Sequence, residues 1–191
     1  MSYDKTKYFE VTDDGVTKTS ELIEQFKKEM NIWITDEIDD IDNQFPIPEL
    51  KTVRYFDREV ESRELGKSVK EADPDNMGIT FREYLILQLQ YFKEEKKHLD
   101  IENWTWCSGS KFKNNKYSSI RFVYANWLPG YGRIIVYAND PGYSFPYLGC
   151  RLSRCIELKI STDLPNFETL DSRVCELESK VEKLLEIINV K

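Results

Sequence analysis

Apolar positions along the chain change their spacing several times, and each change predicts a different element. Residues 17–33 repeat apolar side chains at helical spacing, with Ser20 placed to cap the helix. The stripe comprises Leu22, Phe26, Met30 and Trp33. Prolines at positions 46 and 48 then end any helix, and residues 51–60 alternate loosely enough to predict a weak strand.

A second helix is predicted more sharply by its start signal. Residues 73–78 have the composition of a turn, and Thr80 and Glu83 stand at the spacing of a capping box. The following apolar stripe is broad, and the lysines of 93–98 suit the C-terminal end of a helix. We therefore expect a deeply packed helix from about residue 80.

The spacing shortens toward two from Trp104 onward, which favours strands. Residues 118–127 and 132–139 predict an antiparallel hairpin, with a Leu-Pro-Gly-Tyr connection between them. Alternation places Phe122 and Tyr124 on one face and Val123 and Ala125 on the other. Residues 148–154 and 156–160 predict one or two closing strands.

The last segment carries a heptad seam. Apolar residues recur at alternating steps of four and three: Leu170, Val174, Leu177, Val181, Leu184 and Ile188. This pattern predicts a short coiled coil through which the chain forms a dimer or trimer with itself. Three heptads are marginal alone, so packing of this helix on the chain's own core is the alternative.

These elements predict an α+β protein in three parts. Residues 1–50 form an N-terminal helical and acidic arm, and residues 51–163 form a helix packed on a small antiparallel sheet. Residues 164–191 form the C-terminal oligomerisation helix.

Charge and composition narrow the class of partner. The 191-residue chain has a net charge of −7 and no dense basic block, which argues against nucleic acid. No apolar run is long enough to cross a membrane. The polar N-terminus lacks the apolar core of a signal peptide, so we expect cytoplasmic synthesis, with any export by another route such as cell lysis.

Metal and catalytic signals are weak. His98 is the sole histidine, and the cysteines 107, 150, 155 and 175 match no standard zinc spacing. Residues 73–83 resemble a calcium loop shortened by one residue, which puts Tyr84 where the twelfth-position Glu should be. We therefore expect no resident metal, no cofactor and no enzymatic activity.

Aromatic residues crowd between Asn103 and Cys155, interleaved with Ser, Asn and Gly. Such rings offer rigid contact area and are typical of binding surfaces. The alternative is that most of them are core, because rings at alternating strand positions usually pack inward.

The order W-x-W-C-S-G-S at 104–110, then aromatic strands, then G-C-R-L at 149–152 resembles the C-terminal half of C-type-lectin-like folds in bacterial and phage proteins. These folds include the variable receptor-binding proteins of diversity-generating retroelements. The resemblance covers about residues 81–158 and implies aromatic ligand-binding residues, which here are Tyr124, Trp127, Tyr131, Tyr143 and Tyr147. It departs in lacking the calcium-binding triplets and disulfides of sugar-binding lectins.

Three functions compete. The first is a non-enzymatic oligomeric binding or structural protein, such as a phage virion or adhesion component, presenting an aromatic surface to a protein or glycan. The second is an acidic inhibitor or adaptor that uses residues 36–42 to bind a basic protein. The third is a metal protein or enzyme built on His98 and the cysteines. Light scattering separates the first two, and metal analysis tests the third.

Overall fold

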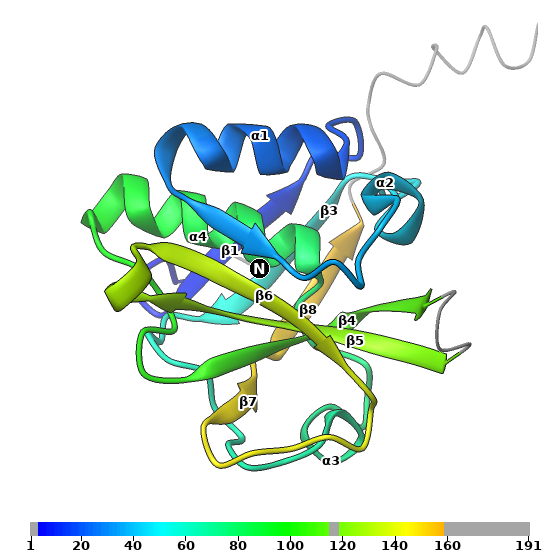
Figure 1. Cartoon of the computed structure of the whole chain (residues 1–191). Helices are drawn as coiled ribbons and strands as arrows, with labels where there is room; N and C mark the ends of the chain where they lie inside the picture. Colours follow the sequence, from blue (N-terminus) through cyan, green and yellow to red (C-terminus); the bar gives the residue numbers. More distant parts are fainter. Residues whose placement is uncertain (1–3, 115–118, 159–191) are drawn as a thin grey trace, which may run out of the picture. The chain divides into compact units, whose positions relative to one another are not determined.

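The computed structural model describes residues 4–114 and 119–158, of which the side chains of Asn114 and of 154–158 are not described. The described residues form one compact unit. It is mixed α+β, as predicted (Figure 1). The elements follow in the order β1 (Tyr8–Asp13), α1 (Thr19–Glu29), β2 (Ile32–Ile34), α2 (Ile41–Gln44), β3 (Thr52–Asp57), α3 (Val69–Ala72), α4 (Phe81–Glu95), β4 (Trp104–Asn114), β5 (Ser119–Leu128), η1 (Pro129–Tyr131), β6 (Arg133–Asn139), β7 (Leu148–Cys150) and β8 (Ser153–Leu158).

A three-stranded antiparallel sheet joins the two ends of this unit. Its order is β1-β3-β8, so the N-terminal strand and the last described strand flank the predicted strand β3. Strand β1 was not predicted, and through it the described residues of the segment predicted as a separate N-terminal arm, 1–50, belong to the same unit. The reason is that the apolar side chains of Phe9 and Val11 are buried in the common core.

The second sheet has five strands in the order β2-β6-β5-β4-β7. Its centre is the antiparallel β5–β6 hairpin, which confirms the prediction for these residues. Strands β2 and β7 add to it in parallel, against β6 and β4 respectively. The spacing from Trp104 onward favours strands, but sequence reasoning did not delimit β4, because its register shifts between Cys107 and Lys111 and so breaks the alternation.

Helices α1 and α4 lie together beside one face of this sheet, called here the inner face (Figure 1). Inner-face side chains such as Val123, Ala125 and Val136 share a core with Phe26 of α1 and Leu85 of α4. Burial of these apolar surfaces is the main stabilising term of the unit. The opposite, outer face of the sheet has its own smaller cluster, centred on Trp106.

The start of α4 confirms the predicted capping box. The Thr80 hydroxyl accepts from the Glu83 amide at 3.1 Å, and the Glu83 carboxylate accepts from the Thr80 amide at 2.8 Å. The same carboxylate pairs with Arg54 of β3 at 2.8 Å. The cap therefore also ties the helix to the three-stranded sheet.

Helix α1 is shorter than predicted. Its N-cap is Lys18, whereas Ser20 donates its hydroxyl to Asp42 at 2.7 Å. The helix ends at Glu29, because the chain turns extended at Met30 and pairs as β2 with β6. Trp33, predicted on the helical stripe, therefore stands on a strand instead.

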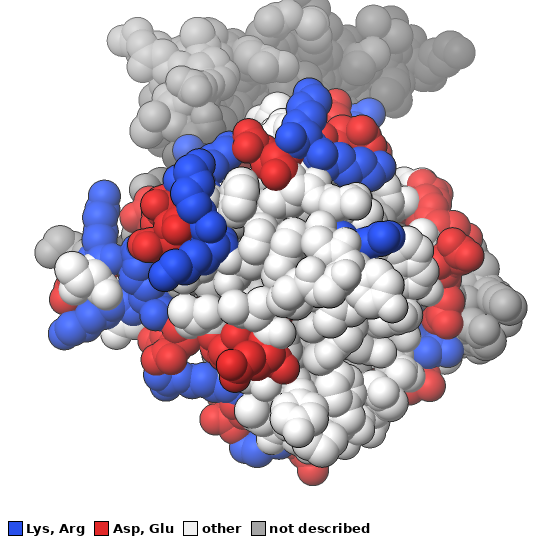
Figure 2. All heavy atoms as spheres, turned by 60° about the vertical axis from the view of Figure 1, so that its left-hand side comes forward, with Lys and Arg blue, Asp and Glu red and all other residues white. Residues whose placement is uncertain are grey.

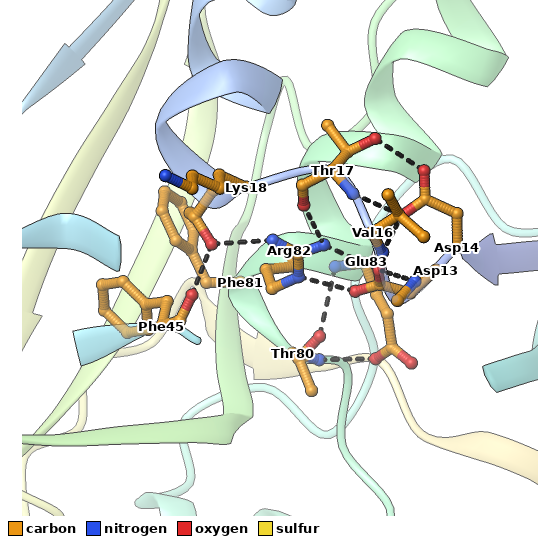
Figure 3. A network of polar contacts seen from close by, with 12 residues as sticks. Asp13, Asp14, Val16, Thr17, Lys18, Phe45, Thr80, Phe81, Arg82 and Glu83 are labelled. Atoms are coloured by element: carbon orange, nitrogen blue, oxygen red, sulfur yellow. Dashed lines mark hydrogen bonds and ion pairs between the residues drawn. The ribbon is translucent and has the colours of Figure 1, made fainter. Parts of the chain in front are cut away.

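Buried arginines connect the elements of this unit. Arg82 of α4 pairs with Asp13 at 2.7 Å, donates to Thr19 at 2.8 Å, and has Thr17 beside it (Figure 3). Arg151 pairs with Asp100 at 2.7 Å in the same manner. Such pairs are well compensated, because each guanidinium also donates to backbone carbonyls.

Candidate ligand-binding surface

The outer face of the five-stranded sheet gathers aromatic side chains from four strands. The register sets Trp33 of β2 beside Ile135 of β6, and Ile135 beside Asn126 of β5. The neighbouring row joins Tyr137 of β6 to Tyr124 of β5 and Tyr124 to Trp106 of β4. Because side chains alternate across a strand, these residues share one face.

The rings on this face form a continuous network. Trp33 meets Tyr137 edge to face at 5.3 Å between ring centroids, and Trp104 lies 5.7 Å from the same Tyr137. Tyr143 and Phe145, from the loop before β7, lie 6.0 and 6.2 Å from the Tyr124 ring. We call these residues the aromatic face: Trp33, Trp104, Trp106, Tyr124, Tyr137, Tyr143 and Phe145. Tilted and edge-to-face contacts at these separations are favourable.

Exposure divides this network into a buried layer, called here the floor, and an exposed layer at the surface. Trp106 and Tyr124 are buried, whereas Trp33, Tyr137 and Tyr143 expose 36%, 39% and 38% of their area. The face of the molecule drawn in Figure 2 has a broad, largely uncharged area in which a basic side chain is set, with acidic and basic residues around it. Buried rings thus hold exposed ones in fixed positions, which is the property a recognition surface needs.

Tyr124 was predicted as a ligand-binding residue, and the structure places it in the floor instead. It is 8% exposed. Burial raises the pKa of its hydroxyl to about 12, and hydrogen bonds link that hydroxyl to Asn139 and Tyr143. Its strand position on a covered part of the outer face explains the burial, so Tyr124 supports the surface and does not form it.

Trp127 was also predicted to bind ligand, and it lies on the other side of the sheet. Trp127 follows Val123 and Ala125 at alternate positions of β5, so its side chain lies on the inner face, where its ring stacks on His98 at 3.4 Å between centroids. Phe92 covers the opposite side of the imidazole at 5.0 Å. Burial lowers the pKa of His98, which favours the neutral ring in this stack.

The remaining three predicted residues are exposed. Tyr143 belongs to the aromatic face, as described. Tyr147 precedes β7 and is 63% exposed, while Tyr131 lies in η1 between β5 and β6, with the Arg133 guanidinium 5.8 Å from its ring centroid. The structure therefore brings together Tyr124 and Tyr143 from the predicted set, and separates Trp127 from both.

Several polar atoms of the outer face have no hydrogen-bond partner among the described residues. They are Asn126 Oδ1, Arg133 Nε and the Trp106 indole Nε1, all of them buried atoms. Asn126 is 2% exposed and stands between Ile135 and the β4 strand in the register. Unpaired buried polar atoms are uncommon in proteins, since each costs about 1–3 kcal/mol.

The acidic run at 36–42 is largely engaged within the unit. Asp42 accepts from the amide and hydroxyl of Ser20, which lowers the pKa of its carboxyl. Asp40 accepts from Asn43, and Glu37 lies 3.8 Å from Arg121 of β5. These carboxylates order the α2 region, so the structure offers no specific support for their use on a basic partner.

The shortened calcium-like loop has a structural role. Asp73 accepts from the amides of Met77 and Gly78 at 2.7 and 2.9 Å and from the Ser108 hydroxyl at 2.6 Å. Both carboxylate oxygens are therefore engaged in shaping the turn before α4. Within the described ranges, no cluster of three or more His, Cys, Asp or Glu side chains is arranged to hold a metal.

The described cysteines are buried thiols. Burial raises the pKa of Cys107 well above its usual value and that of Cys150 to about 12. Cys107 faces the inner core, whereas Cys150 belongs to the outer cluster, so the sheet separates their side chains from each other. His98 is held in its ring stack and does not join them.

A small hollow of about 120 Å³ lies apart from the aromatic face, between β3 and β7. Its carboxylates are already used: Glu61 accepts from the amides of Ile101, Glu102 and Asn103, and Glu59 pairs with Arg63. These contacts fix the loops around residues 60 and 100. The hollow is thus accounted for by the fold.

Sequence reasoning missed Trp33, Trp104 and Tyr137 as members of one surface. For Tyr137, strand alternation could have indicated this surface, since it places Ile135 and Tyr137 on the opposite face from Ile134 and Val136. The sequence around Trp33 contains no such indication, because the position of Trp33 depends on the pairing of β2 with β6, which is distant in the chain.

The predicted oligomerisation residues Leu170, Val174, Leu177, Val181, Leu184 and Ile188 lie outside the described residues. In the part that is described, no helix has the length and apolar character to cross a membrane. Comparisons with protein-family models, curated proteins and solved structures found no match. The resemblance to C-type-lectin-like folds therefore stays a prediction.

Proposed function

We propose that this chain is a non-enzymatic binding protein whose aromatic face contacts a protein or glycan ligand. The C-terminal heptads would join copies of the chain into a dimer or trimer, so that several faces act together. A lectin-like display of ligand-binding rings on a small sheet is part of this proposal.

The observation that carries the proposal is the pair of exposed rings Trp33 and Tyr137 at the edge of a rigid ring network. Large rings at a surface lose little side-chain entropy on binding, and here buried neighbours already fix them. Trp and Tyr are also the side chains most enriched among residues that dominate binding energy.

The test compares the full chain with a Trp33→Ser/Tyr137→Ser double variant on arrays of glycans and of purified proteins. We expect each bound ligand to lose at least about tenfold in affinity, because truncation of such an anchor costs about 1–2 kcal/mol or more. Thermal unfolding of both proteins checks that the fold is kept.

The matched control is Val16→Ser, which removes an exposed apolar side chain between β1 and α1. This variant should bind as the unmodified protein does. Equal binding by the unmodified protein and the double variant would refute the proposal.

A further inference from the structure

We infer that the Trp33 end of the aromatic face binds an acidic saccharide, meaning a pyranose ring that carries a carboxylate. This inference rests on the proposed function and names the ligand class of the same surface. It is argued from three neighbouring features of the outer face: exposed rings, an amide oxygen without a hydrogen-bond partner, and an arginine without an ion pair among the described residues.

The rings supply the apolar part of the site. Trp33 and Tyr137 meet edge to face at an interplanar angle of 66°, and each exposes more than a third of its area. The C–H faces of a pyranose are apolar, whereas its rim of hydroxyls is polar, and an aromatic wall suits the former. Exposed Leu or Met, which would suit an apolar protein segment better, is not part of this ring network.

The amide oxygen of Asn126, a buried side chain near these rings, supplies a hydrogen-bond acceptor. Asn126 stands next to Ile135 in the register, and Ile135 stands next to Trp33. Its Oδ1 has no partner among the described residues. A ligand hydroxyl that reaches this amide after a small shift of a neighbouring ring would satisfy a group that is otherwise unpaired.

Arg133 selects the acidic ligand. Arg133 stands two positions before Ile135 in β6, on the same face by alternation. Among the described residues it forms no ion pair, and its Nε has no hydrogen-bond partner. Its guanidinium lies 5.8 Å from the Tyr131 ring centroid and meets no carboxylate among the described residues of this chain of net charge −7, and its planar donors match a carboxylate.

The size of the exposed area favours a sugar over a protein. Rings of about 150–250 Å² that expose somewhat over a third of their area offer roughly 170–280 Å² from Trp33, Tyr137 and Tyr143 together. A stable protein interface needs about 800 Å² on each partner. One or two sugar units cover the smaller area.

The experiment titrates the full chain with methyl β-D-glucuronide and with methyl β-D-glucoside, which differ in the carboxylate, by saturation-transfer NMR and calorimetry. We expect millimolar binding of the glucuronide, about tenfold tighter than the glucoside, because a charge-assisted pair adds to the ring contacts. Chelation of metal ions should leave binding unchanged, since no metal takes part.

Two variants separate the contributions. Arg133→Gln should remove the preference for the glucuronide and leave weak binding of both sugars, and Trp33→Ala should weaken both by about tenfold or more. Arg63→Gln, which removes an arginine of the separate hollow, and Val16→Ala are the controls and should bind normally. Amide spectra of each variant establish that it is folded.

The inference is overturned if neither sugar binds at tens of millimolar, if both bind equally, or if Arg133→Gln keeps the preference. Its failure differs from failure of the proposed function. A chain that ignores both sugars but loses a protein ligand on the Trp33→Ser/Tyr137→Ser change would retain the proposed function with a different ligand class.

Discussion

Three buried arginines connect segments of this fold that are distant in the sequence. Arg54 lies in β3, Arg82 in α4 and Arg151 between β7 and β8, and each is paired with one carboxylate inside the unit. The planar fork of arginine lets each also donate to other oxygens, which offsets the cost of burying the charge. These residues hold loops that the apolar core alone would leave free.

The Arg82–Asp13 pair gives the first prediction. Both side chains are 4% exposed, so Asp13→Ala should leave an uncompensated buried cation and cost about 3–5 kcal/mol of unfolding free energy. Urea unfolding monitored by circular dichroism measures this loss. Glu24→Ala, which breaks the exposed Lys27–Glu24 pair, should change stability by less than about 1 kcal/mol. Similar losses in both variants would contradict the assignment.

Tyr124 gives a prediction of pH dependence. Its folded pKa of about 12 lies above that of a free tyrosine, near 10, because burial disfavours the phenolate. The unfolded chain therefore releases the proton first as the pH rises. Stability should be constant with respect to this group below about pH 10 and fall between about pH 10 and 12.

Urea unfolding midpoints measured between about pH 9 and 12 test this predicted loss of stability. In Tyr124→Phe, which has no hydroxyl to ionise, the midpoint should fall less steeply over the same interval. An identical slope in both proteins would show that Tyr124 does not contribute. Because the buried thiol of Cys150 titrates in the same direction, some loss should remain in the variant.

Sequence reasoning succeeded at residues whose partners lie nearby in the chain. Thr80 and Glu83 were predicted as a capping box because both bonds span one helical turn. The partners of Trp33 and Asp13 could not be found in this way, because Tyr137 and Arg82 are far away in the sequence. A buried ion pair of this kind leaves no local pattern.

At the scale of elements, close approach between strands sets limits that composition does not reveal. β7 pairs with β4 in parallel, and the segment around Arg63 pairs with Cys150 on its other side. Three segments therefore meet at Gly149, where an added Cβ would lie 2.1 Å from the Arg63 carbonyl oxygen.

Gly149→Ala should accordingly destabilise the unit by at least about 1–3 kcal/mol, because backbone must shift to accept the methyl group. The measurement is the thermal unfolding midpoint with the urea-derived free energy. Gly130→Ala is the matched control, since nothing lies within 4 Å of its added Cβ. If both variants unfold alike, the packing of β7 described above is wrong.

Strands could be predicted from the sequence where the side chains alternate regularly between the two faces, and could not where this alternation is interrupted or too short. β5 and β6 alternate cleanly, with Val123, Ala125 and Val136 inside and Tyr124 and Tyr137 outside. β4 contains an irregularity, and β2 has three residues, which is too short for a period to show. The strand pairings that complete both sheets are therefore set by tertiary packing.

For the whole molecule, the proposed valency depends on the C-terminal heptads. Leu177→Asp placed in this seam should convert the oligomer to a monomer, because a charge at a core position of a three-heptad coil removes its marginal stability. Light scattering of the full chain measures the mass, and circular dichroism follows the rest of the fold. Ser179→Asp, outside the seam, should leave the mass unchanged.

Should the unmodified chain already be monomeric, the heptads pack elsewhere and the multivalent part of the proposal fails. The aromatic face would still bind its ligand one site at a time. Array binding of Leu177→Asp would then match that of the parent chain.

The pairing of β8 with β3 also has a consequence during synthesis. Ser153 of the last described strand bonds to Arg54, 99 positions earlier in the chain. During synthesis, the edge of β3 that pairs with β8 therefore stays unpaired until nearly the whole unit has left the ribosome. Because distant pairings form slowly, that exposed edge is where chaperones or a misplaced second copy would act first.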